Sequence, residues 1–176
     1  MTHEPSEVPG TAIRERAETE IATDIRALTA VSEQIGHLFA HSHSLRSNDF
    51  RALMHIATAE AENRPLTAGQ LRELMGLSSA AITYLVERMI TSGHIRRETD
   101  PRDRRRVLLH YSDHGMSVAG EFFRPVGRRT RAALAELPTT DLLAAHRVFS
   151  AVVSAMRDHH LALTQQAADG NRSGEL

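Results

Sequence analysis

The strongest chemical signal in this sequence is a run of arginines: residues 96–106 contain six arginines and three acidic residues around a single proline. A guanidinium group stays charged and presents a fork of N–H donors that matches phosphate oxygens and base edges. Within the run, Asp100-Pro101-Arg102-Asp103 has the composition of a turn, and short β-type segments flank it. The pattern predicts a β-hairpin whose arginine-rich tip is narrow enough to enter the minor groove of DNA.

Two short helices are predicted immediately before this hairpin, over 67–75 and 78–92. A capping box of the T-x-x-Q type begins at Thr67, and Gly76 occupies the position where a left-handed residue ends a helix. Ser78 is the expected N-cap of the second helix. Two short helices joined by a tight glycine turn form a helix-turn-helix, and a basic hairpin directly after them makes a winged helix.

The second of these helices has two distinct faces. Ile82, Leu85, Val86 and Met89 recur at the spacing of one helix face, which should point inward. The opposite face carries small and hydrogen-bonding side chains that allow close approach to base edges in a major groove about 12 Å wide. The predicted DNA contacts are Ser78, Ser79, Ala80, Ala81, Thr83, Tyr84 and Arg88 in the helix, and Arg97, Arg102, Asp103, Arg104, Arg105 and Arg106 in the hairpin.

Long amphipathic segments flank the DNA-reading block, which we place at residues 47–112. Apolar residues recur every three or four positions in 21–45 and again in 113–164. These segments carry more apolar surface than one small lobe can bury, so we expect them to be the dimerisation helices of a homodimer. Residues 1–20 and 165–176 are predicted to be a flexible arm and a flexible tail.

Local patterns define further boundaries. Ser47 or Asn48 is the expected N-cap of a helix that precedes the helix-turn-helix, and Ser112 should cap the long helix after the hairpin. In the second strand of the hairpin, alternation predicts that Val107 and Leu109 share one side with Tyr111.

Composition excludes several classes of protein. The chain of 176 residues has no cysteine, which excludes disulfides, thiolate metal sites and a cysteine redox switch. Its longest stretch without a charged residue, 74–86, is too short to span a bilayer, and the first residues do not resemble a secretory signal. We therefore expect a cytoplasmic protein without a membrane partner. Net charge is −1, yet 94–131 holds ten arginines against five acidic residues, an asymmetry that points to nucleic acid.

Residues 77–115 resemble the signature of the MarR (multiple antibiotic resistance regulator) family. That signature has a recognition helix, a G-L-V-x-R step and the pattern D-x-R-x-x-x-V-x-L-T-x-x-G across the wing. The corresponding residues here are Gly93-His94-Ile95, Arg97, Asp103-Arg104-Arg105-Arg106-Val107-Leu108-Leu109, Ser112 and Gly115. The resemblance extends over about 21–164. It implies a mainly α fold with a small β-hairpin wing (α+β), a winged helix-turn-helix with long N- and C-terminal dimerisation helices.

The resemblance also implies a function. Members of the family are homodimeric transcriptional regulators, commonly repressors that bind a pseudo-palindromic operator and are released by small phenolic or other aromatic ligands. By this resemblance Arg105 is the minor-groove finger, Asp103 is expected to brace its side chain, and Arg97 lies near both DNA and ligand. Tyr84 stands where a basic residue is frequent in the family.

Histidines are the other group of residues that can bind a ligand. His37 and His41 share one helical face at i, i+4, and we expect an effector pocket between the first helices and the base of the wing. An arginine there can pair with an effector carboxylate. The candidate ligand-binding residues are His37, His41, Met54, His55 and Arg97. A zinc-responsive regulator of the same fold is the alternative use of these histidines, although we predict neither a metal nor another cofactor.

Other function classes find little support in the sequence. It has no glycine-rich phosphate loop, no G-x-S-x-G and no H-E-x-x-H, so we predict that the protein is not an enzyme. A helical protein-interaction module with an incidental arginine hairpin is the alternative to a DNA-binding regulator.

Overall fold

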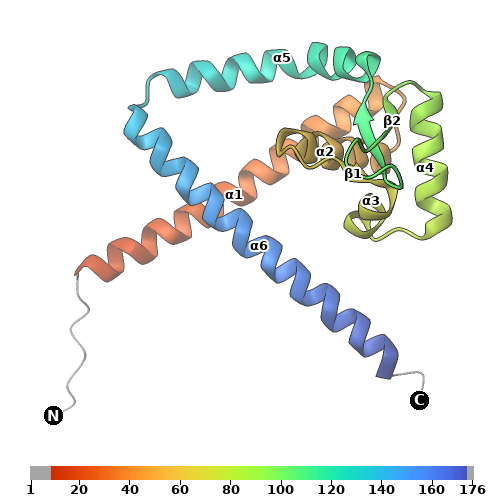
Figure 1. Cartoon of the computed structure of the whole chain (residues 1–176). Helices are drawn as coiled ribbons and strands as arrows, with labels where there is room; N and C mark the ends of the chain where they lie inside the picture. The colour runs from red at the N-terminus through yellow and green to blue at the C-terminus, as the bar shows by residue number, and fades with distance from the viewer. Residues whose placement is uncertain (1–8, 174–176) are drawn as a thin grey trace. The chain divides into compact units, whose positions relative to one another are not determined.

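The computed structural model describes residues 9–173, with side chains from residue 10 to residue 166. Six helices and three strands follow one another in that part of the chain (Figure 1). They are α1 (Pro9–Ser42), α2 (Ser47–Ala61), β1 (Leu66–Thr67), α3 (Ala68–Met75), α4 (Ser79–Thr91), β2 (Ile95–Thr99), β3 (Val107–Tyr111), α5 (Asp113–Ala135) and α6 (Thr139–Ser173). The predicted fold class, mainly α with a small β wing, is confirmed. The chain divides into two compact units, one up to Phe122 and one from Phe123.

The wing belongs to a three-stranded antiparallel sheet in the first unit, with strand order β1-β3-β2. The predicted hairpin of β2 and β3 is confirmed, whereas β1, which pairs Leu66 with Leu109, was not predicted. On β3, where alternation places Val107, Leu109 and Tyr111 on one side, Leu108 and Leu109 are both buried and Val107 is exposed. Neighbouring residues of a strand point to opposite faces, so both faces of this central strand are covered at that point.

The helix-turn-helix forms as its capping residues predict. Thr67 Oγ1 accepts the Gln70 N–H (3.3 Å) and Gln70 Oε1 accepts the Thr67 N–H (2.9 Å), which completes the capping box. Gly76 takes the left-handed conformation with φ +64°, and Ser78 Oγ accepts the Ala81 N–H (3.3 Å). These contacts end α3 and begin α4 within a few residues, which fixes the tight turn between them.

Of the two remaining N-cap predictions, the one for α5 is confirmed and the one for α2 is wrong. Ser112 caps α5 as predicted, because its Oγ accepts the Gly115 N–H (2.9 Å). The cap predicted for α2 is wrong: Arg46 is the N-cap residue, and its backbone N–H donates to Asp49 Oδ2 (3.0 Å). An acidic side chain in the first helical turn can satisfy this backbone donor, so a Ser or Asn cap is not needed.

The core of the first unit lies where the sheet meets the helices. Figure 1 shows α2, α3 and α4 gathered around the small sheet. The largest fully buried side chains come from both helices and strands: Phe39, Leu53, Ile56, Leu71, Val86, Met89, Ile95 and Leu109. The inward face predicted for α4 is confirmed, since Ile82, Leu85, Val86 and Met89 are all buried.

The second unit consists of the later part of α5 and of α6, and none of its described side chains is buried. Phe149, Val153 and Met156 recur at i, i+4 and i+7 and are all exposed, so α6 carries an apolar stripe. No helix within residues 9–173 combines the length and the apolarity that crossing a bilayer requires.

The chain ends differ from the predicted arm and tail. α1 begins at Pro9, so residues 9–20 are helical, and α6 extends the last helix over 165–173. The arm was predicted from its polar composition, but charge pairs at i, i+4 stabilise a polar helix, and Arg14 and Arg16 each bind a glutamate at 2.8 and 2.9 Å. The rest of these two predictions, residues 1–8 and 174–176, lies outside the described residues.

Candidate nucleic-acid interface

The outer face of α4 presents mostly small side chains, and two of their hydroxyl groups form hydrogen bonds within the protein. Ser79, Ala80, Ala81, Thr83 and Tyr84 are all exposed. Their neighbours orient two of the hydroxyls: Ser79 Oγ accepts from Arg72 Nη1 (3.1 Å) and Thr83 Oγ1 donates to the Ser79 carbonyl (2.9 Å). Each hydroxyl oxygen keeps further hydrogen-bonding capacity, so the face is preorganised and remains open to a ligand.

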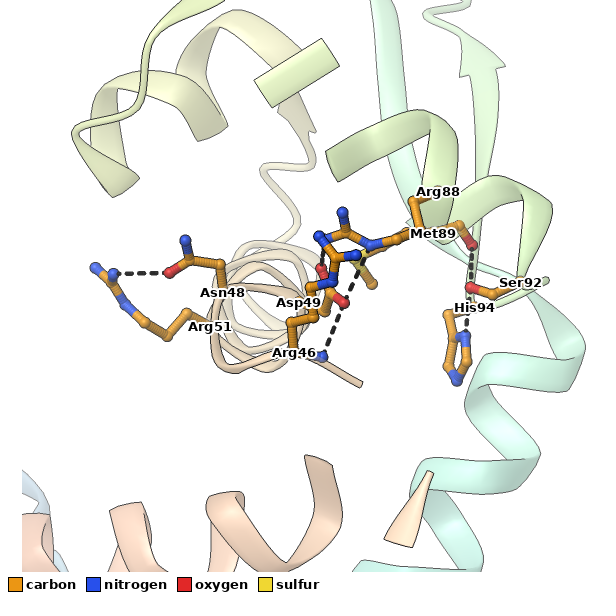
Figure 2. A network of polar contacts seen from close by, with 8 residues as sticks. All are labelled: Arg46, Asn48, Asp49, Arg51, Arg88, Met89, Ser92 and His94. Atoms are coloured by element: carbon orange, nitrogen blue, oxygen red, sulfur yellow. Dashed lines mark hydrogen bonds and ion pairs between the residues drawn. The ribbon is translucent and has the colours of Figure 1, made fainter. Parts of the chain in front are cut away.

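Arg88 departs from the prediction for this face. It was expected on the exposed side, but it is half-buried and both Nε and Nη2 of its guanidinium contact Asp49. The Nε atom lies 3.3 Å from Asp49 Oδ2, and Nη2 forms an ion pair with Asp49 Oδ1 (Figure 2). Asp49 is only 2% exposed. A buried carboxylate requires a cationic partner, which explains why Arg88 turns toward α2.

Two aspartates shape the turn of the wing. Asp100 Oδ1 accepts the Arg102 N–H (2.9 Å), and Asp103 Oδ1 accepts the Arg105 N–H (3.0 Å). The prediction that Asp103 braces the Arg105 side chain is therefore wrong, because Asp103 holds the backbone in an Asx-turn instead. This contact fixes the direction of the chain at residue 105.

The arginines of the wing fall into two groups. In the strands and at their ends, Arg97 Nη2 binds Glu87 Oε1 of α4 at 2.8 Å, Arg96 pairs with Glu98, and Arg106 Nη1 lies 3.3 Å from Asp100 Oδ2. At the tip, the side chains of Arg102, Arg104 and Arg105 form no ion pair with any described residue. All three are exposed. The tip thus carries three cations without a counter-charge among the side chains that the structure describes, those of residues 10–166.

The base of the wing is anchored by contacts that were not predicted. Glu60 of α2 accepts the Tyr111 N–H (3.3 Å) and lies 2.7 Å from His110 Nδ1, while the Tyr111 hydroxyl donates to the Leu53 carbonyl (3.3 Å). Burial, together with the charge of Glu60, raises the pKa of Tyr111 well above its ordinary value. Only tertiary structure brings α2 to β3 across 50 residues, so no local pattern could reveal this anchor.

The candidate effector residues are distributed over three elements of the first unit. His37 and His41 are exposed on α1, Met54 is exposed and His55 half-buried on α2, and Arg97 on β2 is engaged by Glu87. Burial, and then the charge of Arg51, lower the pKa of His55. Among the described residues, no group of three or more His, Asp or Glu side chains is arranged to hold a metal ion.

Two cavities lie along the DNA-reading block, and neither is lined by those five residues. One of about 400 Å³ lies between the start of α2 and α4, beside Tyr84 and Arg88. The other, of about 790 Å³, lies between the end of α2 and the turn of the wing. The assignment of an effector site to the five residues therefore stays a prediction.

Comparison with known proteins agrees with this architecture. Residues 43–106 match the model of the MarR family, which covers α2, the helix-turn-helix and the wing turn. An uncharacterized HTH-type transcriptional regulator, YcgE of Bacillus subtilis, is 39% identical over 69 residues, which is 39% of this chain. The aligned segment spans less than half, 45%, of that relative's own length.

Solved structures with the same fold are more remote in sequence. A mutant of MepR from a multidrug-resistant S. aureus clinical isolate has a TM-score of 0.61 at 11% identity, covering 77% of this chain and 96% of that one. A MarR family protein from Bacillus stearothermophilus has a TM-score of 0.55 at 22% identity, covering 81% and 96%. Residues 43–106 are thus similar to the MarR family in sequence, and the chain shares the fold of these two solved structures.

Proposed function

We propose that this protein is a sequence-specific DNA-binding transcriptional regulator and not an enzyme. It acts as a homodimeric repressor that binds a pseudo-palindromic operator and is released by a small aromatic or phenolic ligand. The observation that carries the proposal is the pairing of two surfaces in the first unit. One is the exposed small-residue face of α4, and the other is the wing tip, whose three arginines have no counter-charge among the described residues.

The two surfaces have different roles in the proposed complex. The face of α4 carries no acidic residue before Glu87 and is narrow at Ala80 and Ala81, which suits base edges in the major groove. Arg105, with Arg102 and Arg104 beside it, suits the narrow and strongly negative minor groove next to it. Arg97 and Arg106 are neutralised by acidic partners, so they contribute to the shape of the wing and less to phosphate attraction.

The proposed dimer follows from the apolar residues that the second unit leaves exposed. A stripe of Phe149, Val153 and Met156 on α6 has no cover within its own unit. Exposed apolar patches of this kind mark interfaces. A two-fold symmetric dimer would place its two copies of the helix-turn-helix and wing on half-sites about one helical turn, roughly 10 bp, apart.

The most specific part of the proposal concerns the residues that bind the effector. Candidate residues are His37, His41, Met54, His55 and Arg97, and a carboxylate-bearing aromatic ligand that displaced Glu87 from Arg97 would loosen the wing from α4. Release of bound operator by such a ligand, and its absence in Arg97→Gln, would support this assignment. Release that persists unchanged in Arg97→Gln would contradict it.

The test of DNA recognition is a selection of bound fragments from the source genome, followed by affinity measurements on the best site at several salt concentrations. We expect the logarithm of the association constant to fall linearly with log salt, with a slope of roughly −0.9 for each phosphate neutralised. A scrambled duplex of equal length is the control for sequence preference. A flat salt dependence, or equal affinity for dextran sulfate and for the selected site, would favour a protein-interaction module instead.

A further inference from the structure

Tyr84 is the one large apolar side chain exposed on α4 among the described residues, and two guanidinium groups hold it. The Cζ atom of Arg88 lies 4.9 Å from the centroid of the Tyr84 ring, and that of Arg46 lies 5.8 Å away. Both distances are within the range of cation–π attraction. The residue is 59% exposed, so these two cations, and not core packing, set the position of its ring.

Arg88 is in turn fixed by Asp49. The buried carboxylate binds Arg88 through both Nε and Nη2, and it also accepts the backbone N–H of Arg46 (Figure 2). Two-point contact fixes the plane of a guanidinium as well as its place. A continuous set of contacts therefore leads from Asp49 in α2, through Arg88, to the exposed ring of Tyr84.

The space beside the ring makes this support necessary. The cavity of about 400 Å³ between the start of α2 and α4 is lined by Tyr84, Arg46, Arg88 and Ala81, among others. A tyrosine next to an open volume of that size has room for more than one rotamer. The cations favour the rotamer in which the ring lies against them on the outer face of α4.

We propose that Asp49 is a positioning residue for DNA recognition, because through Arg88 it holds Tyr84 in the orientation in which Tyr84 contacts the operator. This inference rests on the proposed function and deepens it. A buried ion pair adds little net stability compared with apolar residues of the same size, so its value here lies in the arrangement that it imposes. Tyr84, and not the half-buried Arg88, is then the member of this set that contacts the bases.

The first test needs no DNA. The chain has two tyrosines and no tryptophan, so phenolate absorbance follows tyrosine ionisation directly. The hydrogen bond from Arg88, and then the charge of Arg46, lower the pKa of Tyr84, whereas burial raises the pKa of Tyr111, which separates the two transitions. We expect Asp49→Asn to move the earlier transition upward, toward the ordinary value for tyrosine of about 10.

Controls make this titration specific. Tyr84→Phe should remove the earlier transition and thereby assign it. Arg51→Gln changes an exposed arginine on the same helix that binds Asn48 and should leave the transition in place. If Asp49→Asn does not fold, the double variant Asp49→Asn/Arg88→Gln replaces the ion pair with two amides and leaves no buried charge unpaired. A transition that stays in place or moves downward in these variants would overturn the inference.

The second test measures discrimination between the selected operator and versions with single base changes. We expect Tyr84→Ala to reduce discrimination at one base position by roughly 5- to 150-fold, the usual range for a specific base contact. Asp49→Asn should reduce discrimination at that same position, and it should add nothing in the Tyr84→Ala background. The slope of the log association constant against log salt should be the same in Tyr84→Ala, in Asp49→Asn and in the variant that combines them, because phosphate contacts are unchanged.

The outcomes separate this inference from the proposed function. If Asp49→Asn reduces base discrimination further in the Tyr84→Ala background, then Asp49 acts only through stability. That result would overturn the inference, while operator binding would stand. No sequence preference in the unsubstituted protein would overturn the proposed function and the role of Tyr84 together. In that case the titration would still report whether Asp49 holds the ring.

Discussion

Arg105 lies at the turn of the wing, where the Asp103 side chain fixes its backbone and no described acidic residue neutralises its side chain. We expect Arg105→Ala to weaken operator binding by about 1–3 kcal/mol, because it removes the cation that is proposed to enter the minor groove. The melting temperature should not change, since the side chain is exposed and makes no ion pair with a described residue. Fluorescence anisotropy at fixed salt measures the binding and calorimetry the stability.

Arg51→Ala is the matched control for this prediction, because it removes an exposed arginine from α2. Equal losses in both variants would show that net charge alone, and not the wing tip, determines affinity. Asp103→Asn provides a further comparison, since an asparagine side chain also accepts the Arg105 N–H and should preserve most of the binding.

His94 lies in the turn between α4 and β2 and is buried, with its Nδ1 2.8 Å from Ser92 Oγ (Figure 2). Burial is the largest cause that lowers its pKa, followed by the nearby charges of His114 and His43, while Asp49 raises it. The neutral form is thus favoured in the folded protein. Below about pH 6.5 the unfolded chain binds a proton at His94 more strongly than the folded protein does. The stability that depends on a neutral His94 is therefore complete above that pH, and it is lost as the pH falls toward the lowered pKa.

We therefore expect the free energy of unfolding to decrease as the pH falls below about 6.5, and His94→Gln to reduce that decrease. Denaturant titrations at a series of pH values measure it. Identical pH profiles for both proteins would contradict the assignment of the effect to His94.

At the scale of secondary structure, the start of α5 lies against the turn before β2. A Cβ atom added at Gly115 would come within 2.1 Å of the His94 carbonyl oxygen, a backbone atom that cannot move aside alone. We expect Gly115→Ala to destabilise the protein by about 1–3 kcal/mol or more, as overpacking does. Thermal unfolding measures the change.

Gly120 offers the control on the same helix. A Cβ atom there would meet nothing within 4 Å, so Gly120→Ala should stabilise α5 by roughly 0.5–1 kcal/mol through helix propensity. A destabilised Gly120→Ala would mean that α5 tolerates no added methyl group, and a loss of stability in Gly115→Ala would then not reflect the close contact with His94.

The elements that sequence reasoning predicted well are those whose signals are local. The capping box at Thr67, the left-handed Gly76 and the cap at Ser78 all depend on residues a few positions apart, and each forms as predicted. The arginine hairpin is likewise defined by its own turn residues. Local chemistry thus predicted the helix-turn-helix, the wing and the exposed residues of α4 between them.

Predictions failed where a distant residue decides the outcome. Arg88 was placed on the outer face by its helical position, but Asp49, 39 residues earlier, draws it inward. The strand β1 has only two residues, too few for a periodic signal. In each case the missing information is tertiary contact.

At the scale of the whole molecule, the proposed binding of an operator with two half-sites depends on whether two chains associate. The exposed stripe on α6 is the part of the second unit that a partner copy would cover in the proposed homodimer. Val153 lies in the middle of that stripe, between Phe149 and Met156. A glutamate at this position would place an unpaired charge in the apolar interface, which costs several kcal/mol.

We therefore expect Val153→Glu to be monomeric in analytical ultracentrifugation at concentrations where the unsubstituted protein is dimeric. Its affinity for a duplex with two half-sites should fall on the order of 10²- to 10⁴-fold, because the second helix-turn-helix and wing are no longer held in the same dimer as the first. Its affinity for a duplex with one half-site should change little, since α4 and the wing belong to the other unit. Ser154→Glu places the same charge on a different side of α6 and should leave both affinities and the dimer intact. If Val153→Glu stayed dimeric, or lost one-site and two-site binding equally, the stripe on α6 would not be the surface through which two chains read one operator.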